Sequence, residues 1–289
     1  MTDVIITRKN NHIVAVSASG HTGYGESGED IVCAGISTLI QSSLLGLLQV
    51  AGIAVKNSGE ISECVNEGSI TAEGKGKAFV GGIASVSIEA ISYCLTSGEI
   101  SVNADSAFVG GIAGKSEVYI SRSFFGYSVY FCNAEHCISE SKISVTVPEG
   151  NTACVGGIIG RIDEDYIDLS YSEGGTIVTE RIYYGGGALN CYFAGEFVND
   201  GNYCGNIVGA CGANIYEVNS YTFNGVEYNN FSDNCYKENS KNAFGAVYTV
   251  DGGGEENFVS PVDDKGATAT DGNISESEGY KEILEKLGR

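Results

Sequence analysis

The sequence contains few basic side chains and few of the residues that build metal sites. Its 289 residues include 16 lysines and arginines against 37 aspartates and glutamates, with only three histidines and two prolines. The net charge of −21 disfavours direct contact with RNA or an anionic lipid surface, since both are negatively charged. No Cys-x-x-Cys spacing occurs, and Cys132, His136 and Cys137 match no zinc pattern. We therefore expect no nucleic-acid partner, no metal and no cofactor.

Uninterrupted apolar runs are also scarce. The first ten residues are strand-like, carry Asp3 and lack the apolar core of a signal peptide. Residues 31–50 are long and apolar enough for a buried helix. Serine, threonine, glutamine and glycine interrupt this segment, which makes it too polar to span a membrane. The sequence therefore predicts no membrane span and a cytoplasmic location.

One stretch carries residues suited to catalysis. Residues 19–39 read SGHTGYGESGEDIVCAGISTL, with His21 and Cys33 joined by a glycine-rich acidic loop. Two short strands are expected before it, and the helix of residues 31–50 after it. Cys33 falls in the first turn of that helix, where unpaired N–H groups and the helix dipole favour a thiolate. A loop histidine beside such a thiolate is a suitable general base. The alternative is a small buried cysteine and an unrelated polar histidine.

This stretch resembles a known family. The segments SGHTGY (19–24) and GEDIVCAGIS (28–37), with the hairpin before them, resemble the N-terminal half of the bacterial ribosomal-processing cysteine protease family, Prp. The resemblance covers residues 1 to about 54. The family fold continues with a further strand and a second long helix, whereas this chain changes character at about Lys56.

The resemblance implies an activity and site residues. It implies that His21 and Cys33 are the catalytic dyad. Asp30 and Ala34, at the expected start of the helix, are in supporting positions. It also implies that the substrate is a ribosomal protein precursor. In this family, the precursor is a protein of the large ribosomal subunit, and its short N-terminal extension is removed by cleavage after an aromatic residue.

The rest of the chain repeats two short patterns. The pattern apolar-Gly-Gly-apolar begins at Val80, Val109 and Val155, and we assign degraded copies to segments beginning at Gly185, Cys204 and Phe244. The second pattern includes ECVNEGSI, YCLTSGEI, HCISESKI and NCYFAGEF, which begin at Glu63, Tyr93, His136 and Asn190; weaker copies begin at Asn219 and Asn234. The first copies lie 29–30 residues apart, a period typical of stacked repeats. With 41 glycines and alternating apolar positions, the region predicts a repeat β-solenoid.

Residues 57–250 also resemble a family of repeats. The glycine-rich core resembles GLUG-motif repeats, which occur in large bacterial surface proteins and are packing units without catalytic residues. This resemblance implies a cell-surface or secreted location as the alternative to the cytoplasm. It also implies a protein or surface partner for the repeat array.

The cysteines follow the repeat. Nine of the ten come after residue 56, and five occupy the same place in successive copies: Cys64, Cys94, Cys137, Cys191 and Cys235. Equivalent positions of stacked repeats lie above one another, and small apolar side chains pack well inside such a stack. The sequence therefore favours a column of buried free thiols over disulfides.

These observations define a mainly β chain with three parts. Residues 1–55 form a small α/β protease-like segment (a β-hairpin plus a long helix), residues 56–250 a β-helix-like solenoid, and residues 251–289 a linker with a short amphipathic helix at 276–287. That helix either caps the solenoid or packs on the N-terminal helix. Two functions are compatible with the sequence: a cysteine endopeptidase, or a non-catalytic surface or partner-binding protein with a degenerate N-terminal cap.

Overall fold

The chain divides into two compact units. In the computed structural model these units are Met1–Gln49 and Val50–Arg289. The residues that the structure describes are 2–9, 12–20, 53–123, 126–173, 176–217, 220–223, 226–229, 235–237, 242–260, 267–269 and 274–289. The helix predicted at residues 31–50 lies outside them.

The first unit contains an antiparallel pair of strands. β1 (Thr2–Lys9) pairs with β2 (His12–Gly20) from Thr2 opposite Gly20 to Lys9 opposite His12. The register shifts between Thr7 and Arg8, which marks a bulge in the pair. The predicted N-terminal hairpin is therefore confirmed.

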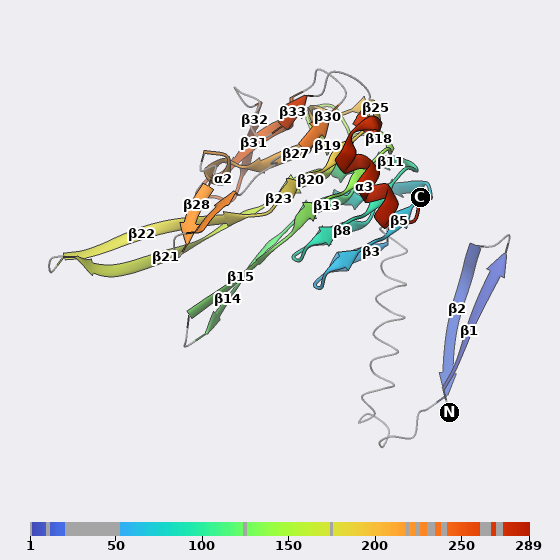
Figure 1. The fold of residues 1–289 in the computed structure, drawn as a ribbon, viewed down its shortest axis with the longest axis horizontal. Coiled ribbons are helices and arrows are strands. Elements are labelled where there is room, and N and C mark those ends of the chain that lie inside the picture. The colour runs from blue at the N-terminus through green and yellow to red at the C-terminus, as the bar shows by residue number, and fades with distance from the viewer. Residues whose placement is uncertain are drawn as a thin grey trace. The chain divides into compact units, whose positions relative to one another are not determined.

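In the second unit, successive stretches of chain contribute strands to five sheets (Figure 1). The seven-stranded sheet has the order β3 (Ala54–Asn57), β8 (Ala84–Ser87), β13 (Ala113–Ser116), β20 (Ile159–Ile162), β27 (Val208–Gly212), β31 (Phe244–Val250) and β32 (Glu256–Val259). The six-stranded sheet contains β5 (Val65–Asn66), β10 (Leu95–Thr96), β17 (Ile138–Ser139), β24 (Tyr192–Phe193), β30 (Cys235–Lys237) and β33 (Ala267–Ala269).

Three four-stranded sheets complete this arrangement. One contains β4 (Ile61–Ser62), β9 (Ile91–Ser92), β16 (Asn133–Glu135) and β23 (Gly187–Leu189). The next contains β6 (Ile70–Glu73), β11 (Glu99–Asn103), β18 (Lys142–Thr146) and β25 (Glu196–Asp200). The last contains β7 (Lys77–Gly81), β12 (Ser106–Gly110), β19 (Ala153–Gly156) and β26 (Tyr203–Gly205). Neighbouring strands of the five sheets are parallel, except for β31 and β32, which are antiparallel.

The register agrees with most of the predicted repeat. Val80, Val109 and Val155 lie opposite one another and are fully buried, and Cys204 continues the row. One degraded copy was assigned wrongly, because glycine content alone does not fix the register. Phe244 lies opposite Val208, four residues beyond Cys204, so its segment is out of step with the VGGI copies.

Two further assignments need correction. Gly187 pairs with Asn133 in another sheet, so the glycine-rich segment from Gly185 is not a VGGI copy. The segment from Asn219 contains β28 (Ser220–Phe223), which pairs antiparallel with β29 (Val226–Asn229) and is not a repeat strand. The strand of the copy beginning at Asn234 has the predicted register, because Tyr236 pairs with Tyr192, the equivalent residue of the copy beginning at Asn190.

The glycine pair of each clear copy allows a close approach of backbones. A Cβ atom on Gly110 would overlap the carbonyl oxygen of Ala113, and one on Gly111 would overlap the carbonyl oxygen of Gly157 in the next copy. The corner between β12 and β13 therefore requires residues without a side chain. This requirement explains why the Gly-Gly pair recurs.

Hairpins project from the same connection in successive copies. In the first copy only residues 88–90 connect β8 to β9. The next two connections contain β14 (Val118–Ser123) with β15 (Gly126–Phe131), and β21 (Glu164–Glu173) with β22 (Thr176–Gly185). The register shows that residues 118–131 and 164–185 are insertions into a three-residue connection. Figure 1 shows both hairpins extending away from the parallel sheets.

The C-terminal segment packs on the six-stranded sheet. A 3₁₀ turn, η1 (Ile274–Glu276), precedes α3 (Glu278–Lys286), whose first turn is capped by Ser277. Tyr280 and Ile283 are buried against Leu95 and Ile138. The predicted amphipathic helix is thus confirmed, and it packs on the repeat region.

The part of residues 251–289 that was expected to be a linker contains β32 and β33. One further short helix, α2 (Ala213–Glu217), follows β27. Among the residues that the structure describes, no helix combines the length and the apolar character needed to cross a membrane.

Candidate active site

The predicted catalytic residues follow the N-terminal hairpin in the chain. Gly20, the last residue of β2, immediately precedes His21. His21, Asp30, Cys33 and Ala34 all lie outside the described residues. Their assignment to a catalytic site therefore stays a prediction.

The cysteines of the repeat form the predicted column of free thiols. Cys94, Cys137, Cys191 and Cys235 are fully buried, and Cys64 is half-buried. The Cys137 thiol donates to the Ile91 carbonyl over 3.4 Å, and the Cys191 thiol donates to the Ala134 carbonyl over 3.2 Å. Burial raises the pKa of both thiols. The column therefore packs the core and does not supply nucleophiles.

His136 and the cysteines beside it have separate environments. The His136 ring stacks on the Tyr93 ring with 4.8 Å between centroids, whereas the Cys137 thiol points to buried carbonyls. Burial raises the pKa of Cys132 to about 12. No group of three or more histidine, cysteine or acidic side chains suited to a metal ion occurs within the described residues.

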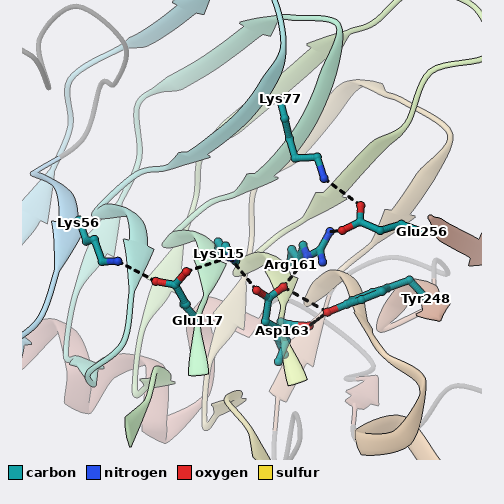
Figure 2. Close-up of polar contacts among 9 residues, drawn as sticks. Lys56, Lys77, Lys115, Glu117, Arg161, Asp163, Tyr248 and Glu256 are labelled. Carbon is teal, nitrogen blue, oxygen red and sulfur yellow. Dashed lines mark hydrogen bonds and ion pairs between the residues drawn. The ribbon is translucent and has the colours of Figure 1, made fainter. Parts of the chain in front are cut away.

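The most extensive polar cluster among the described residues is an alternating series of ion pairs (Figure 2). We call it the ion-pair chain; its members, in order of contact, are Lys56, Glu117, Lys115, Asp163, Arg161, Glu256 and Lys77. The distances between charged atoms are 2.9, 3.2, 2.7, 2.6, 2.9 and 2.9 Å in that order. Its members come from the seven-stranded sheet, the residues just after β13 and β20, and β7. The ion-pair chain therefore connects segments that are distant in sequence.

Arg161 is the most buried member of the ion-pair chain. Its side chain is 7% exposed and lies between two rings, 5.1 Å from the Phe108 centroid and 4.2 Å from the Tyr248 centroid. The Tyr248 hydroxyl donates to Asp163 Oδ1 over 3.2 Å. β32 covers this place, because Phe258 contacts the rings of Phe108 and Tyr248. Carboxylates and aromatic faces together compensate the cost of burying the guanidinium.

The electrostatics follow from this geometry. Burial alone would raise the pKa of Asp163, but the charges of Arg161 and Lys115 and their hydrogen bonds outweigh it, so the pKa lies below its ordinary value. The same balance lowers the pKa of Glu117, beside Lys56 and Lys115, and of Glu256. Burial and the neighbouring Asp163 raise the pKa of Tyr248. All three carboxyl groups are therefore ionised at neutral pH and act as fixed counter-ions.

The ion-pair chain was not anticipated from the sequence, although a signal was present. VGGIAGKSE from Val109 and VGGIIGRID from Val155 place a cation six residues, and an acid eight residues, after the valine. The cations are Lys115 and Arg161. Alignment of the two copies beyond their glycines would have paired them.

Comparison with known proteins concerns the N-terminal third of the chain. The family model of the cysteine protease Prp matches residues 1–95, which include all four predicted site residues. The match extends past residue 54, where the resemblance noted from the sequence ends. It includes β3 to β9 and the first residue of β10, and these strands pair with later repeats. No curated protein matches the chain. The N-terminal region is therefore similar to a cysteine protease.

Proposed function

We propose that the chain is a cysteine endopeptidase with His21 and Cys33 as its catalytic dyad. The observation that carries this proposal is the match of residues 1–95 to the cysteine protease Prp model. His21 accepts the proton of the Cys33 thiol, and the thiolate attacks the scissile carbonyl carbon. Backbone N–H groups around Cys33 and Ala34 stabilise the oxyanion, and Asp30 supports the start of the helix. Water then hydrolyses the thioester.

The proposed substrate is the precursor of a large-subunit ribosomal protein, cleaved in the cytoplasm after an aromatic residue near its N-terminus. The proposal rests on the Prp match alone. Residues 56–250 are, in this proposal, a β-solenoid of GLUG type appended to the protease segment. The support is the parallel register, in which successive copies each add a strand to the same sheets.

A second candidate is a non-catalytic binding protein whose N-terminal segment caps the solenoid, at the cell surface or secreted. One observation favours it. The strands of the first copy, β3, β4, β5, β6 and β7, each stand at the end of their sheet's strand order. Exposed edge strands need a cover, and repeat arrays use atypical terminal units for this purpose.

The two candidates differ in a cleavage assay. The full chain is incubated with a peptide spanning the N-terminal processing site of the ribosomal protein, alongside Cys33→Ala and His21→Ala. Cys204→Ala and His12→Ala are matched controls. Cleavage that is lost in Cys33→Ala and His21→Ala but kept in the two control variants supports the endopeptidase. Absence of cleavage by the folded parent chain, with slow alkylation of Cys33, supports the binding protein.

A further inference from the structure

The projecting hairpins hold a concentration of tyrosine. The strands of the three hairpins β14–β15, β21–β22 and β28–β29 contain nine of the 17 tyrosines in the chain. The same strands contain six acidic residues, two arginines and no lysine; all six acids lie on β21, β22 and β29, whereas β14 and β15 carry Arg122 and no acid. Tyrosine combines a large apolar face with a hydroxyl and is enriched at binding surfaces. Core packing does not explain this enrichment, because four of these side chains, Tyr119, Tyr127, Tyr130 and Tyr166, are exposed.

The exposure is marked on the first hairpin. Tyr119, Tyr127 and Tyr130 are 53%, 48% and 40% exposed. Tyr119 and Tyr130 lie directly opposite each other, with ring centroids 6.1 Å apart. On the second hairpin Tyr166 is 38% exposed. The two hairpins contact each other, β14 against β21 and β15 against β22, so they form one projecting unit.

The second hairpin shows what such a surface binds. The Arg181 guanidinium lies 3.8 Å above the Tyr166 ring and donates to both oxygens of Asp168, over 2.7 and 2.9 Å. The same combination recurs on α3, where Lys286 lies 3.5 Å from the Tyr93 ring centroid and pairs with Glu63. A tyrosine face beside a carboxylate is therefore this fold's recurring site for a cation.

We propose that the exposed tyrosines of β14–β15, beside the acidic hairpin β21–β22, are a docking surface for a cationic, arginine-containing segment of another polypeptide. Charge complementarity selects this partner, since β21 and β22 carry five acidic residues against Arg181 alone and the whole chain carries −21. Arginine suits the surface better than lysine, because its planar and weakly hydrated guanidinium stacks on aromatic rings while it pairs with carboxylates. The docking surface acts independently of catalysis at Cys33.

The test is fluorescence anisotropy with the full chain and a short labelled peptide of alternating arginine and serine. Matched peptides carry lysine or glutamate in place of arginine. Tyr119→Ser combined with Tyr130→Ser removes the exposed pair, and Val198→Ser, an exposed position on β25, is the control. Each variant is compared with the parent chain by circular dichroism.

A deletion provides a second variant. Removing residues 118–131 leaves Glu117, Cys132 and Asn133, the same length as the connection 88–90 of the first copy. Removing residues 164–185 leaves a connection of that length in the next copy.

The proposal expects the arginine peptide to bind more tightly than the lysine peptide, and the glutamate peptide not to bind. It expects about a tenfold loss of affinity in the tyrosine double variant and complete loss in the double deletion, with Val198→Ser unchanged. Equal affinity in parent and hairpin variants overturns it, as does an equal response to arginine and lysine. A dimer of the parent chain that dissociates when the hairpins are removed overturns it in favour of a second copy as partner.

Discussion

Lys115 and Arg161 lie directly opposite each other on β13 and β20, and the carboxylate of Asp163 contacts both cations. Like charges in directly opposed positions destabilise neighbouring strands. Arg161 is 7% exposed and Lys115 15%, so solvent screens little of their repulsion. Asp163 therefore allows two cations to occupy adjacent copies of the repeat.

Replacing Asp163 should destabilise the fold. Asp163→Asn keeps the size of the side chain but leaves Arg161 and Lys115 without their shared anion. We expect a loss of about 3 kcal/mol in the free energy of unfolding, the range found when one partner of a buried ion pair is removed. Urea unfolding followed by circular dichroism measures this change.

Asp168→Asn is the matched control. Asp168 also binds an arginine, Arg181, but both side chains are more than 40% exposed. Exposed pairs contribute little, so the urea midpoint of this variant should stay at the parent value. Equal midpoints for the Asp163 and Asp168 variants would contradict a stabilising role for the ion-pair chain.

The ion-pair chain also predicts how stability depends on pH. The pKa values of Glu117, Asp163 and Glu256 lie below their ordinary values. Such groups contribute fully above the unfolded pKa, about 3.9 for aspartate and 4.3 for glutamate, and lose their contribution as pH falls through the native pKa. The urea midpoint should therefore change little between neutral pH and about pH 5 through these groups, and fall below that.

The Asp163→Asn variant separates this effect from other carboxyl groups. With one of the three depressed carboxyls absent, its midpoint should fall less steeply in acid than that of the parent chain. Parallel pH profiles for the two proteins would show that the acid sensitivity arises elsewhere.

The glycine corner predicts a position-specific cost. A Cβ atom on Gly111 would overlap the Gly157 carbonyl oxygen and the Ser139 side chain. We expect Gly111→Ala to lower the free energy of unfolding by at least about 2 kcal/mol, because the backbone of the neighbouring corner between β19 and β20 cannot move aside cheaply. Gly74→Ala is the control, since nothing lies within 4 Å of its Cβ position. Thermal unfolding of both variants measures the difference, and similar melting temperatures would refute a steric role for Gly111.

Much of the repeat could be predicted from spacing, because paired strands in parallel sheets must keep a constant period. The thiol column follows from the equivalent places of Cys94, Cys137 and Cys191. The projecting hairpins could not be predicted from spacing. Their residues alternate like any other strand, and only the register shows that 118–131 and 164–185 are insertions.

Glycine content was a poor guide where the copies diverge. The segments from Gly185 and Phe244 resemble VGGI in composition. However, the strand in the first segment belongs to a different sheet from the VGGI strands, and Phe244 pairs four residues beyond the position that a VGGI copy would occupy. The candidate site depended on a different kind of signal. His21 and Cys33 were identified from a motif, and chemistry at that motif remains a prediction that a direct measurement of thiol reactivity can test.

Alkylation under native conditions distinguishes core thiols from a catalytic one. Cys137 and Cys191 are fully buried, with pKa values raised by burial, so iodoacetamide at neutral pH should leave both unmodified. Cys64 is half-buried with a raised pKa and should react slowly. If Cys33 is an activated nucleophile it should react first, and His21→Ala should slow that reaction without changing the rate at Cys64.

Peptide mass spectrometry assigns each adduct, and labelling in urea confirms that all ten cysteines can react. Fast native modification of Cys137 and Cys191 would contradict the buried column. Equal rates at Cys33 and Cys64, unaffected by His21→Ala, would remove the support for a dyad. Because the two thiols belong to the same chain, Cys64 is an internal standard for reagent and pH. The ratio of the two rates therefore reports the environment of Cys33 itself.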